Sequence, residues 1–267
     1  MKKIIAMILA LVMCFALVAC GGNDDAANND SADAGFTTAV EGKLYVATNV
    51  AFPPYEYYEG TEAVGIDMDI ARAIGEKLGL EVVIEDMEFD AINESVKSGK
   101  SDVGFGGMTV TEERKEIIDF TSSYATGVQV VIVKEDSSIA SVDDLFAEGA
   151  MHTIGVQRNT TGDLYTTCDL EDAGLATIDR YSKGADAVQS LVAGKVDCVV
   201  IDNEPAKAFV AENEGLKILD TAYALEEYAA SVSKDNPELY AAINGALEEL
   251  IADGTVAAIV EKYIPAA

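Results

Sequence analysis

The sequence has few positive charges, a single histidine and no tryptophan. Of its 267 residues, 18 are Lys or Arg and 47 are Asp or Glu, for a formal net charge of −29. A chain this acidic repels phosphate backbones, so no nucleic-acid partner is expected, and the charge favours a soluble monomer. The sequence contains no phosphate loop, no metal-spaced His/Cys cluster and no nucleophile–histidine pair. We therefore expect neither a metal nor a cofactor.

Long apolar runs are also absent, except at the N-terminus. Lys2 and Lys3 precede an apolar run over residues 4–19, which is typical of an export signal. The run is shorter than the roughly 20 residues of a membrane helix, although an uncleaved anchor helix is the alternative. Residues 20–35 are small, polar and acidic, and they predict a disordered tether.

Cysteine is scarce, with four residues in the chain. Cys14 lies inside the signal, and Cys20 closes the motif "LVAC". Cys168 and Cys198 belong to the folded part, which an export signal would place in a compartment that permits disulfides. Two readings stay open for this pair: a disulfide, or two separate small hydrophobic side chains, one of them in a buried strand.

From Gly42 onward, short apolar runs alternate with helical patterns, which indicates an α/β fold. The predicted strands cover residues 43–48, 81–85, 102–105, 129–134, 153–156, 176–181 and 196–201. The predicted helices cover residues 66–80, 90–98, 162–173 and 184–193, and two more lie in the tail, 236–264.

Two segments repeat the same order of features. "VKSGKSDVGFGG" (96–107) and "LVAGKVDCVVID" (191–202) each contain a helix end, a Gly-Lys turn, an aspartate and a buried strand. In open α/β sheets, ligands bind beyond the carboxyl ends of the strands. The repeat therefore predicts two lobes that face one cleft, unless Gly-Lys-x-Asp is here only a common helix-to-strand turn.

Arg114 is the candidate for holding an anion in this acidic chain. It lies five residues beyond Thr109, inside a helix predicted to begin near Thr111. A guanidinium fork matches the two oxygens of a carboxylate, hydroxyl groups add donors, and free N–H groups at a helix N-terminus favour anions. The alternative is a solvated arginine in a helix that Thr111 caps.

An aromatic loop follows the first predicted strand. "TNVAFPPYEYYEG" (48–60) surrounds two prolines, which exclude a helix or a central strand and predict a rigid loop. Its aromatic side chains could cover the apolar stem of a ligand. Phe52 is the best candidate for that role, whereas Tyr57 and Tyr58 fit core or hinge packing better.

These motifs resemble one protein family over nearly the whole chain. The matching runs are "LYVATNVAFPPYEY", "VGIDMDIARAIGEKLGLEV", "SGKSDVGFGGMTVTEERKEIIDFTSSY", "IGVQRNTTGDLY" and "KVDCVVIDNEPAKAFV". They resemble the amino-acid-binding branch of bacterial ABC-transporter solute-binding proteins. The resemblance implies the type II periplasmic-binding fold, in which two α/β lobes joined by two hinge strands close over a solute in a central cleft. Lobe 1 would cover 36–127 and 229–267, and lobe 2 would cover 128–228.

The resemblance also implies roles for individual residues. Arg114, Thr109 and the Gly107 backbone would bind the carboxylate of an amino acid, and Thr161 would add a donor from the second lobe. Asp202 would hold the ammonium group. The side chain would lie between Phe52 and Phe89, with Asn49 at its end.

The chain departs from the family pattern at two positions. Relatives often carry aspartate where Asn49 stands, and some of those take cationic ligands. A neutral amide therefore argues against arginine or lysine and leaves glutamine, cystine or another polar amino acid. Many relatives carry glycine at Asn159, so the turn there could differ.

"LVAC" resembles the lipobox of bacterial lipoproteins. By that likeness, Cys20 becomes the lipidated first residue of a protein held outside the cytoplasm, anchored to the membrane. The expected partners are a free polar amino acid and the permease and ATPase subunits of an ABC importer.

Two other functions compete with simple binding. The same fold hosts dehydratases of cyclic carboxylates, which need a general acid or base; His152 is the only histidine and precedes a strand rather than ending one. A sensor ectodomain would need a separate signalling chain. We expect a binding protein and not an enzyme.

Overall fold

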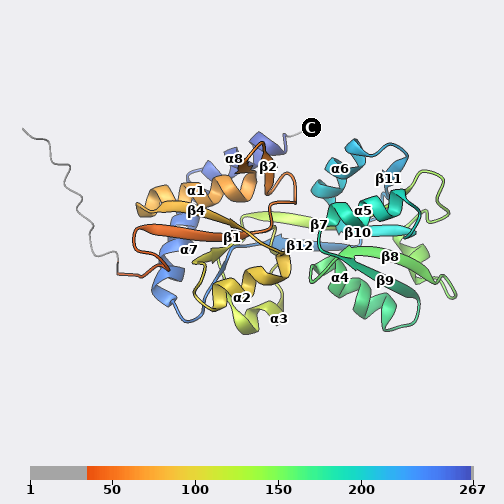
Figure 1. The fold of residues 1–267 in the computed structure, drawn as a ribbon, viewed down its shortest axis with the longest axis horizontal. Coiled ribbons are helices and arrows are strands. Elements are labelled where there is room, and N and C mark those ends of the chain that lie inside the picture. Colours follow the sequence, from red (N-terminus) through yellow and green to blue (C-terminus); the bar gives the residue numbers. More distant parts are fainter. Residues whose placement is uncertain (1–34, 266–267) are drawn as a thin grey trace, which may run out of the picture. The chain divides into compact units, whose positions relative to one another are not determined.

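The structure is a computed structural model that describes residues 35–265, and it contains two mixed sheets, one in each lobe (Figure 1). The order of the first sheet is β4 (Glu81–Asp86), β1 (Lys43–Thr48), β5 (Val103–Gly104), β13 (Ser231–Val232) and β6 (Asp119–Phe120). Strands β4, β1 and β5 are parallel, and β13 runs antiparallel to β5 and β6.

The second sheet repeats this arrangement with different strands. Its order is β11 (Leu216–Ile218), β7 (Ala125–Lys134), β10 (Cys198–Asp202), β8 (His152–Gln157) and β9 (Ala176–Tyr181), and β12 (Ala224–Tyr228) also pairs with β7. Strands β9, β8 and β10 are parallel, whereas β7 is antiparallel to β10. The two sheets therefore share one strand order.

Strands β7 and β12 connect the two lobes (Figure 1). They pair antiparallel from Ala125 opposite Tyr228 to Gln129 opposite Ala224. This is the pair of connecting strands that the family resemblance implied. The lobe boundaries 36–127, 128–228 and 229–267 remain a prediction.

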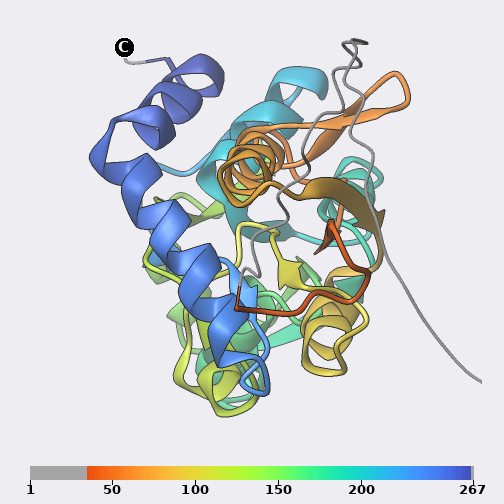
Figure 2. The ribbon, with the colours of Figure 1, turned by 90° about the vertical axis from the view of Figure 1, so that its left-hand side faces the viewer.

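Helices cover both faces of the first sheet. Helix α1 (Ile66–Leu78) packs against α7 (Pro237–Ala252) and α8 (Thr255–Tyr263), and Figure 2 shows these last two helices in blue across the near side. Helix α2 (Ile92–Lys97), preceded by the 3-10 turn η1 (Phe89–Ala91), packs on β1, β5 and β13. Helix α3 (Glu112–Ile117) follows β5 along the chain.

Helices of the second lobe cover its sheet. They are α4 (Thr161–Thr166), the π-helical turn η3 (Thr167–Glu171), α5 (Gly184–Val192) and α6 (Asn203–Glu212), and the 3-10 segment η2 (Val142–Phe146) lies outside this layer. Helices α4 and α5 lie on the parallel strands, and α6 lies on β7, β11 and β10. None of the helices within residues 35–265 is long and apolar enough to cross a bilayer.

The predicted helices and strands are largely confirmed. Helix α1 ends as predicted at Gly79, which adopts a left-handed conformation. The predicted helix 162–173 is instead α4 followed by the π-helical turn η3. The patterns did not predict α6, the hairpin of β2 (Tyr57–Glu59) and β3 (Glu62–Val64), or the short strands β6, β11, β12 and β13. The prediction of core packing is wrong for Tyr58, because this side chain is 49% exposed on the β2–β3 hairpin.

The structure decides the question about the folded cysteines. Both are free thiols: Cys198 is fully buried in β10, and Cys168 is exposed in η3. The two side chains face different surroundings, so the disulfide reading is wrong and the separate-thiol reading is right. The predicted signal (1–19), most of the tether and Cys20 lie outside the described residues.

Candidate functional site between the two sheets

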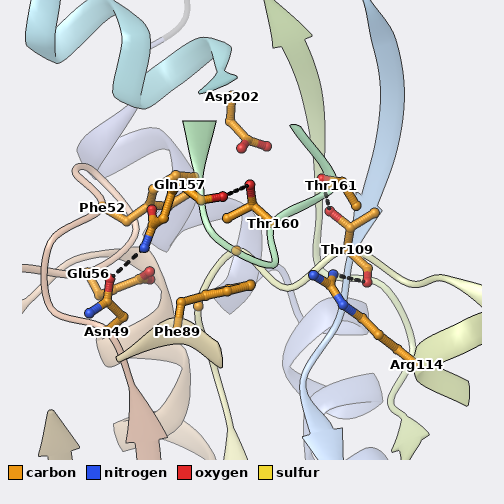
Figure 3. A pocket seen from close by; sticks show the side chains of 12 residues that line it. Asn49, Phe52, Glu56, Phe89, Thr109, Arg114, Gln157, Thr160, Thr161 and Asp202 are labelled. Carbon is orange, nitrogen blue, oxygen red and sulfur yellow. Dashed lines mark hydrogen bonds between the residues drawn. The ribbon is translucent and has the colours of Figure 1, made fainter. Parts of the chain in front are cut away.

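One pocket brings together all eight residues predicted to bind a ligand (Figure 3). The free space that its lining residues enclose is about 10 Å³, room for about one water molecule, so the side chains of the pocket lie close to one another in this structure. The predicted residues are Asn49, Phe52, Phe89, Gly107, Thr109, Arg114, Thr161 and Asp202. The pocket is also lined by Glu56, Gly106, Gln157 and Thr160. The binding roles of the eight residues remain a prediction.

Arg114 is a buried cation with polar contacts only to backbone oxygens. The side-chain oxygen of Thr111 caps α3 by accepting from the Arg114 backbone N–H, which fixes the start of the helix. The guanidinium donates to the carbonyls of Thr109 (2.8 Å) and Asn159 (2.9 Å), and no carboxylate in residues 35–265 forms an ion pair with it. Burial lowers the pKa of Arg114, although nearby acids oppose this shift. Three of the five guanidinium N–H donors are therefore left for an anion.

A buried carboxylate shapes the loop that precedes Arg114. Asp67, at the start of α1, accepts from the backbone N–H groups of Gly106 (2.9 Å) and Gly107 (2.8 Å). Gly107 has φ +51°, and a Cβ atom there would lie 2.8 Å from the ring of Phe52. Only glycine fits both the backbone conformation and the space. Burial raises the pKa of Asp67 to about 6, and its hydrogen bonds limit the rise.

Asp202 supplies negative charge from the second sheet. It is the last residue of β10 and is 6% exposed. Its Oδ1 accepts from the hydroxyl of Tyr228 on β12, and the Tyr228 ring meets Tyr55 edge to face with centroids 5.2 Å apart. Burial, and then the charge of Glu226, raise the pKa of Asp202 to about 8. A cationic group beside Asp202 would restore its charge.

The two lobes touch across the pocket. The hydroxyls of Thr109 and Thr161 are 3.4 Å apart, and the amide of Gln157 donates to the side-chain oxygen of Asn49 (3.1 Å). Nearer the rim, Arg158 pairs with Asp90 at 2.7 Å. Because these contacts join residues of different sheets, the structure is a closed form of the cleft.

Asn159 lies in a turn that positions one of the acceptors of Arg114. It has φ +60°, a left-handed conformation that asparagine tolerates better than most residues. Its backbone N–H donates to Asp163 (2.9 Å), and its carbonyl accepts from Arg114. A difference between this turn and that of relatives with glycine stays a prediction.

Two aromatic rings line the pocket from different elements. Phe52, in the loop after β1, is 7% exposed, and Phe89 begins η1. The guanidinium carbon of Arg114 lies 5.5 Å from the centroid of the Phe89 ring. The side-chain amide of Asn49 donates to the Met87 carbonyl (2.8 Å) as well as accepting from Gln157, so part of its bonding capacity is already used.

Glu56 is the most informative residue that the sequence patterns missed. It is 1% exposed, lines the pocket, and its Oε2 is buried with no hydrogen-bond partner in the described part of the chain. Burial raises the pKa of Glu56 well above its usual range, and Asp67 adds to the rise. Its place in "PPYEYY" gives no sign of burial, because the surrounding tyrosines predict only a surface loop.

Among the described residues, the site contains neither a histidine nor a metal-binding cluster. His152 opens β8 at the end opposite the pocket and does not line it. Within residues 35–265, no group of three or more His, Cys, Asp or Glu side chains is arranged to hold a metal ion. The arrangement can instead hold a small zwitterion, with its anion at Arg114 and its cation at Asp202.

Known proteins match both the sequence and the fold. The chain is 30% identical to the arginine-binding extracellular protein ArtP of Bacillus subtilis (strain 168), with 98% of each chain covered. It is similar to the structure of an ancestral arginine-binding protein bound to arginine, with TM-score 0.77, 39% identity, and 83% of this chain and 98% of that chain covered. The structure of an ancestral arginine-binding protein bound to glutamine matches with TM-score 0.77 and 38% identity, and with 84% of this chain and 98% of that chain covered.

The family model for bacterial extracellular solute-binding proteins, family 3, matches residues 44–266. The match includes both sheets, both connecting strands and every residue that lines the pocket. This chain therefore belongs to family 3 of the bacterial extracellular solute-binding proteins.

Proposed function

We propose that this chain is the binding component of an amino-acid ABC importer and that its ligand carries a cationic side chain, with L-arginine the first candidate. The observation that carries the proposal is the buried guanidinium of Arg114, unpaired within the described residues, in a pocket that also contains the buried carboxylate of Asp202. A buried charge requires compensation, and an amino acid brings a carboxylate and an ammonium group to these two positions.

The expected strength of binding suits transport. Charge-assisted hydrogen bonds contribute roughly 1.5–3 kcal/mol each. Three or four of them, less the cost of ordering and closure, give about −8 kcal/mol, or micromolar affinity. Since Arg114 and Asp202 follow strands of different sheets, only the closed form uses both. The ligand therefore favours closure, which a membrane transporter can recognise.

Glu56 supports a ligand with a cationic side chain. Four carboxyl groups are buried in and behind the pocket, namely Glu56, Asp67, Asp202 and Glu226, while Arg114 is the only cationic residue among those that line it. The pocket is thus acidic, and the free Oε2 of Glu56 offers an acceptor to a guanidinium. This proposal departs from the expectation drawn from Asn49, and the Bacillus relative is named as an arginine-binding protein.

L-Glutamine is the second candidate ligand. The amides of Asn49 and Gln157 line the pocket, and the raised pKa of Glu56 favours a protonated carboxyl that could hydrogen-bond a neutral side chain. A related ancestral protein carries glutamine in its structure.

Titration calorimetry with L-arginine and L-glutamine tests the proposal. We expect saturable binding of arginine to the wild-type protein. Glu56→Gln should lower the affinity for arginine by about 10- to 100-fold, because one charge-assisted contact is lost, and should leave the affinity for glutamine unchanged. The matched control is Glu59→Gln, on the exposed part of the hairpin. Equal losses for both ligands would remove the selecting role of Glu56, and no heat with any common amino acid would end the proposal.

The other functions have less support. A dehydratase needs a general acid or base; the only histidine lies away from the pocket, so a carboxyl group would have to serve, and the relatives are named as binding proteins. A sensor ectodomain would predict that deleting the gene leaves arginine uptake intact. Loss of uptake on deletion would support the importer.

The lipid anchor is part of the proposal. Cys20 follows an export signal in a lipobox-like motif, and the chain belongs to an extracellular family. We expect signal-peptidase inhibition by globomycin to leave a larger precursor, and Cys20→Ala to release the protein from membranes. Normal processing under globomycin would contradict the role of Cys20.

A further inference from the structure

A second buried carboxylate lies beside Asp202, and the binding roles above do not use it. Glu226, on the connecting strand β12, is 6% exposed and does not line the pocket. Its Oε2 accepts from the hydroxyl of Thr109 (3.1 Å) and from the amide of Gln129 (3.0 Å). Its Oε1 is buried and has no partner in the described part of the chain.

The strand register brings Glu226 and Asp202 to one face of the sheet. Asp202 on β10 lies opposite Gln129 on β7, and Glu226 on β12 lies opposite Gly127 on β7. Opposite residues and residues two apart share a face, so the two carboxylates lie on the same face of the sheet, on the strands that flank β7. A Cβ atom at Gly127 would meet the Tyr228 hydroxyl, which donates to Asp202, and the amide of Gln129 donates to Glu226.

Burial and the nearby charge of Glu226 both oppose the ionisation of Asp202. Three donors serve the pair, from Tyr228, Thr109 and Gln129. Arg114 forms no ion pair with either carboxylate, so an ionised Asp202 would have no cation bonded to it within the described residues. The other titratable groups whose charges couple to Asp202 are Arg114 on α3, Tyr228 on β12, Tyr165 on α4, and Tyr55 and Glu56 in the loop after β1.

We propose that Glu226 is a positioning residue of the ammonium site, and that Asp202, beside the charge of Glu226, holds one proton when the site is empty and releases it to solvent when an ammonium group enters. This proposal rests on the proposed function. An ammonium group brings three donors and a full positive charge to Asp202, which then favours the ionised form of Asp202. Glu226 also bonds Thr109, so one carboxylate on a connecting strand links the two predicted binding sites.

The sign of the pH dependence follows from this proton. Ionisation of Asp202 must precede or accompany binding, so affinity falls as the pH drops below the raised pKa of about 8. For one proton released, the association constant changes by about tenfold per pH unit well below that pKa. We therefore expect arginine to bind about ten times more weakly at pH 6 than at pH 7.

Titration calorimetry in buffers of different ionisation enthalpy measures how many protons the protein releases for each ligand that it binds. The probe is L-arginine at pH 7, with the full folded protein. The test variant is Glu226→Gln, which keeps the shape and an acceptor for Thr109. The control is Glu227→Gln, which removes an exposed carboxylate one residue further along the same strand. Any proton that leaves Glu56 is common to both variants, so the difference isolates the pair.

We expect Glu226→Gln to release fewer protons per arginine than Glu227→Gln and to move the pH dependence of binding to lower pH, because burial of Asp202 remains while the charge of Glu226 is lost. A merely structural role would lower affinity without changing the proton count. Saturable heat that does not depend on the buffer in the wild-type protein would overturn this inference alone, as would equal proton counts in the two variants. Absence of saturable heat in the wild-type protein would overturn the proposed function, and the inference with it.

Discussion

Residues 95–107 and 190–202 follow the same path in the two lobes until their strands end. The backbone N–H of Lys100 bonds the carbonyl of Ser95 (3.0 Å), and that of Lys195 bonds Ser190 (2.9 Å). Gly99 and Gly194 turn the chain with φ +70° and +69°. The difference lies beyond the turn: the first strand leads into a glycine loop and Arg114, and the second ends at Asp202.

The aspartates after these turns are also equivalent. Asp102 exchanges two hydrogen bonds with the backbone of Tyr45, and Asp197 does the same with Thr153. The matching strand order places Asn49 and Gln157 after equivalent strand positions, and their side chains meet in the pocket. The same arrangement of turn and strand therefore occurs in both lobes. The residues at and beyond the ends of these strands give the two sides of the pocket opposite charges, Arg114 on one wall and Asp202 on the other.

The largest effect on affinity is expected when the cation of the first lobe, Arg114, is removed. Arg114→Ala should weaken amino-acid binding by about 3–6 kcal/mol, or 10²- to 10⁴-fold, because two charge-assisted contacts to the ligand carboxylate are lost. Calorimetry measures the effect. Lys115→Ala, which removes an exposed cation of the same helix, should leave the affinity unchanged. Binding that survives Arg114→Ala would show that the carboxylate lies elsewhere.

Removing the anionic wall should have a smaller and more selective effect. Asp202→Asn should lower the affinity for amino acids by about 10- to 100-fold, since one charge-assisted hydrogen bond to the ammonium group is lost. The deaminated analogue of the same ligand lacks that group, so its affinity should not fall. Competition titrations with both compounds give the comparison, and equal losses would count against an ammonium site at Asp202.

The equivalent aspartates should differ in their contribution to stability. Asp102 is 5% exposed and accepts from both Ala39 and Tyr45, whereas the side chain of Asp197 is 55% exposed and accepts from Thr153 alone. Asp102→Ala should lower the free energy of unfolding by about 2–3 kcal/mol, and Asp197→Ala by less than about 1 kcal/mol. Urea unfolding measures both values. Equal losses would mean that the repeat is equivalent in energy as well as in geometry.

The smallest expected effect concerns the contact at the rim. Arg158 and Asp90 are 44% and 27% exposed, and such surface pairs contribute about 0.2–1 kcal/mol. Arg158→Ala should therefore weaken arginine binding by no more than about fivefold, and the loss should shrink at high salt. Lys97→Ala breaks a surface pair within one lobe and serves as the control. A loss beyond tenfold would make this pair a principal determinant of closure.

The sequence predicted most of the frame because its signals are local. Alternation of apolar runs gave β1, β4, β8 and β9, and Gly79 gave the end of α1. Helix α6 lacked a clear signal in the sequence. Pro205 lies in its first turn, and the helix follows the buried strand β10 without a loop between them. Strands such as β6 and β13, with two residues each, exist only because a neighbouring strand pairs with them.

The sequence by itself determined the two-lobe α/β frame and the placing of Arg114 and Asp202 beyond strand ends, because hydrophobic periodicity and turn residues act over short stretches of chain. Only the tertiary structure decided that Glu56 and Glu226 are buried and that Cys168 and Cys198 stay apart. Thr109 and Glu226, for example, are 117 residues apart in the chain. Burial and charge pairing depend on such distant partners, and no local pattern encodes them.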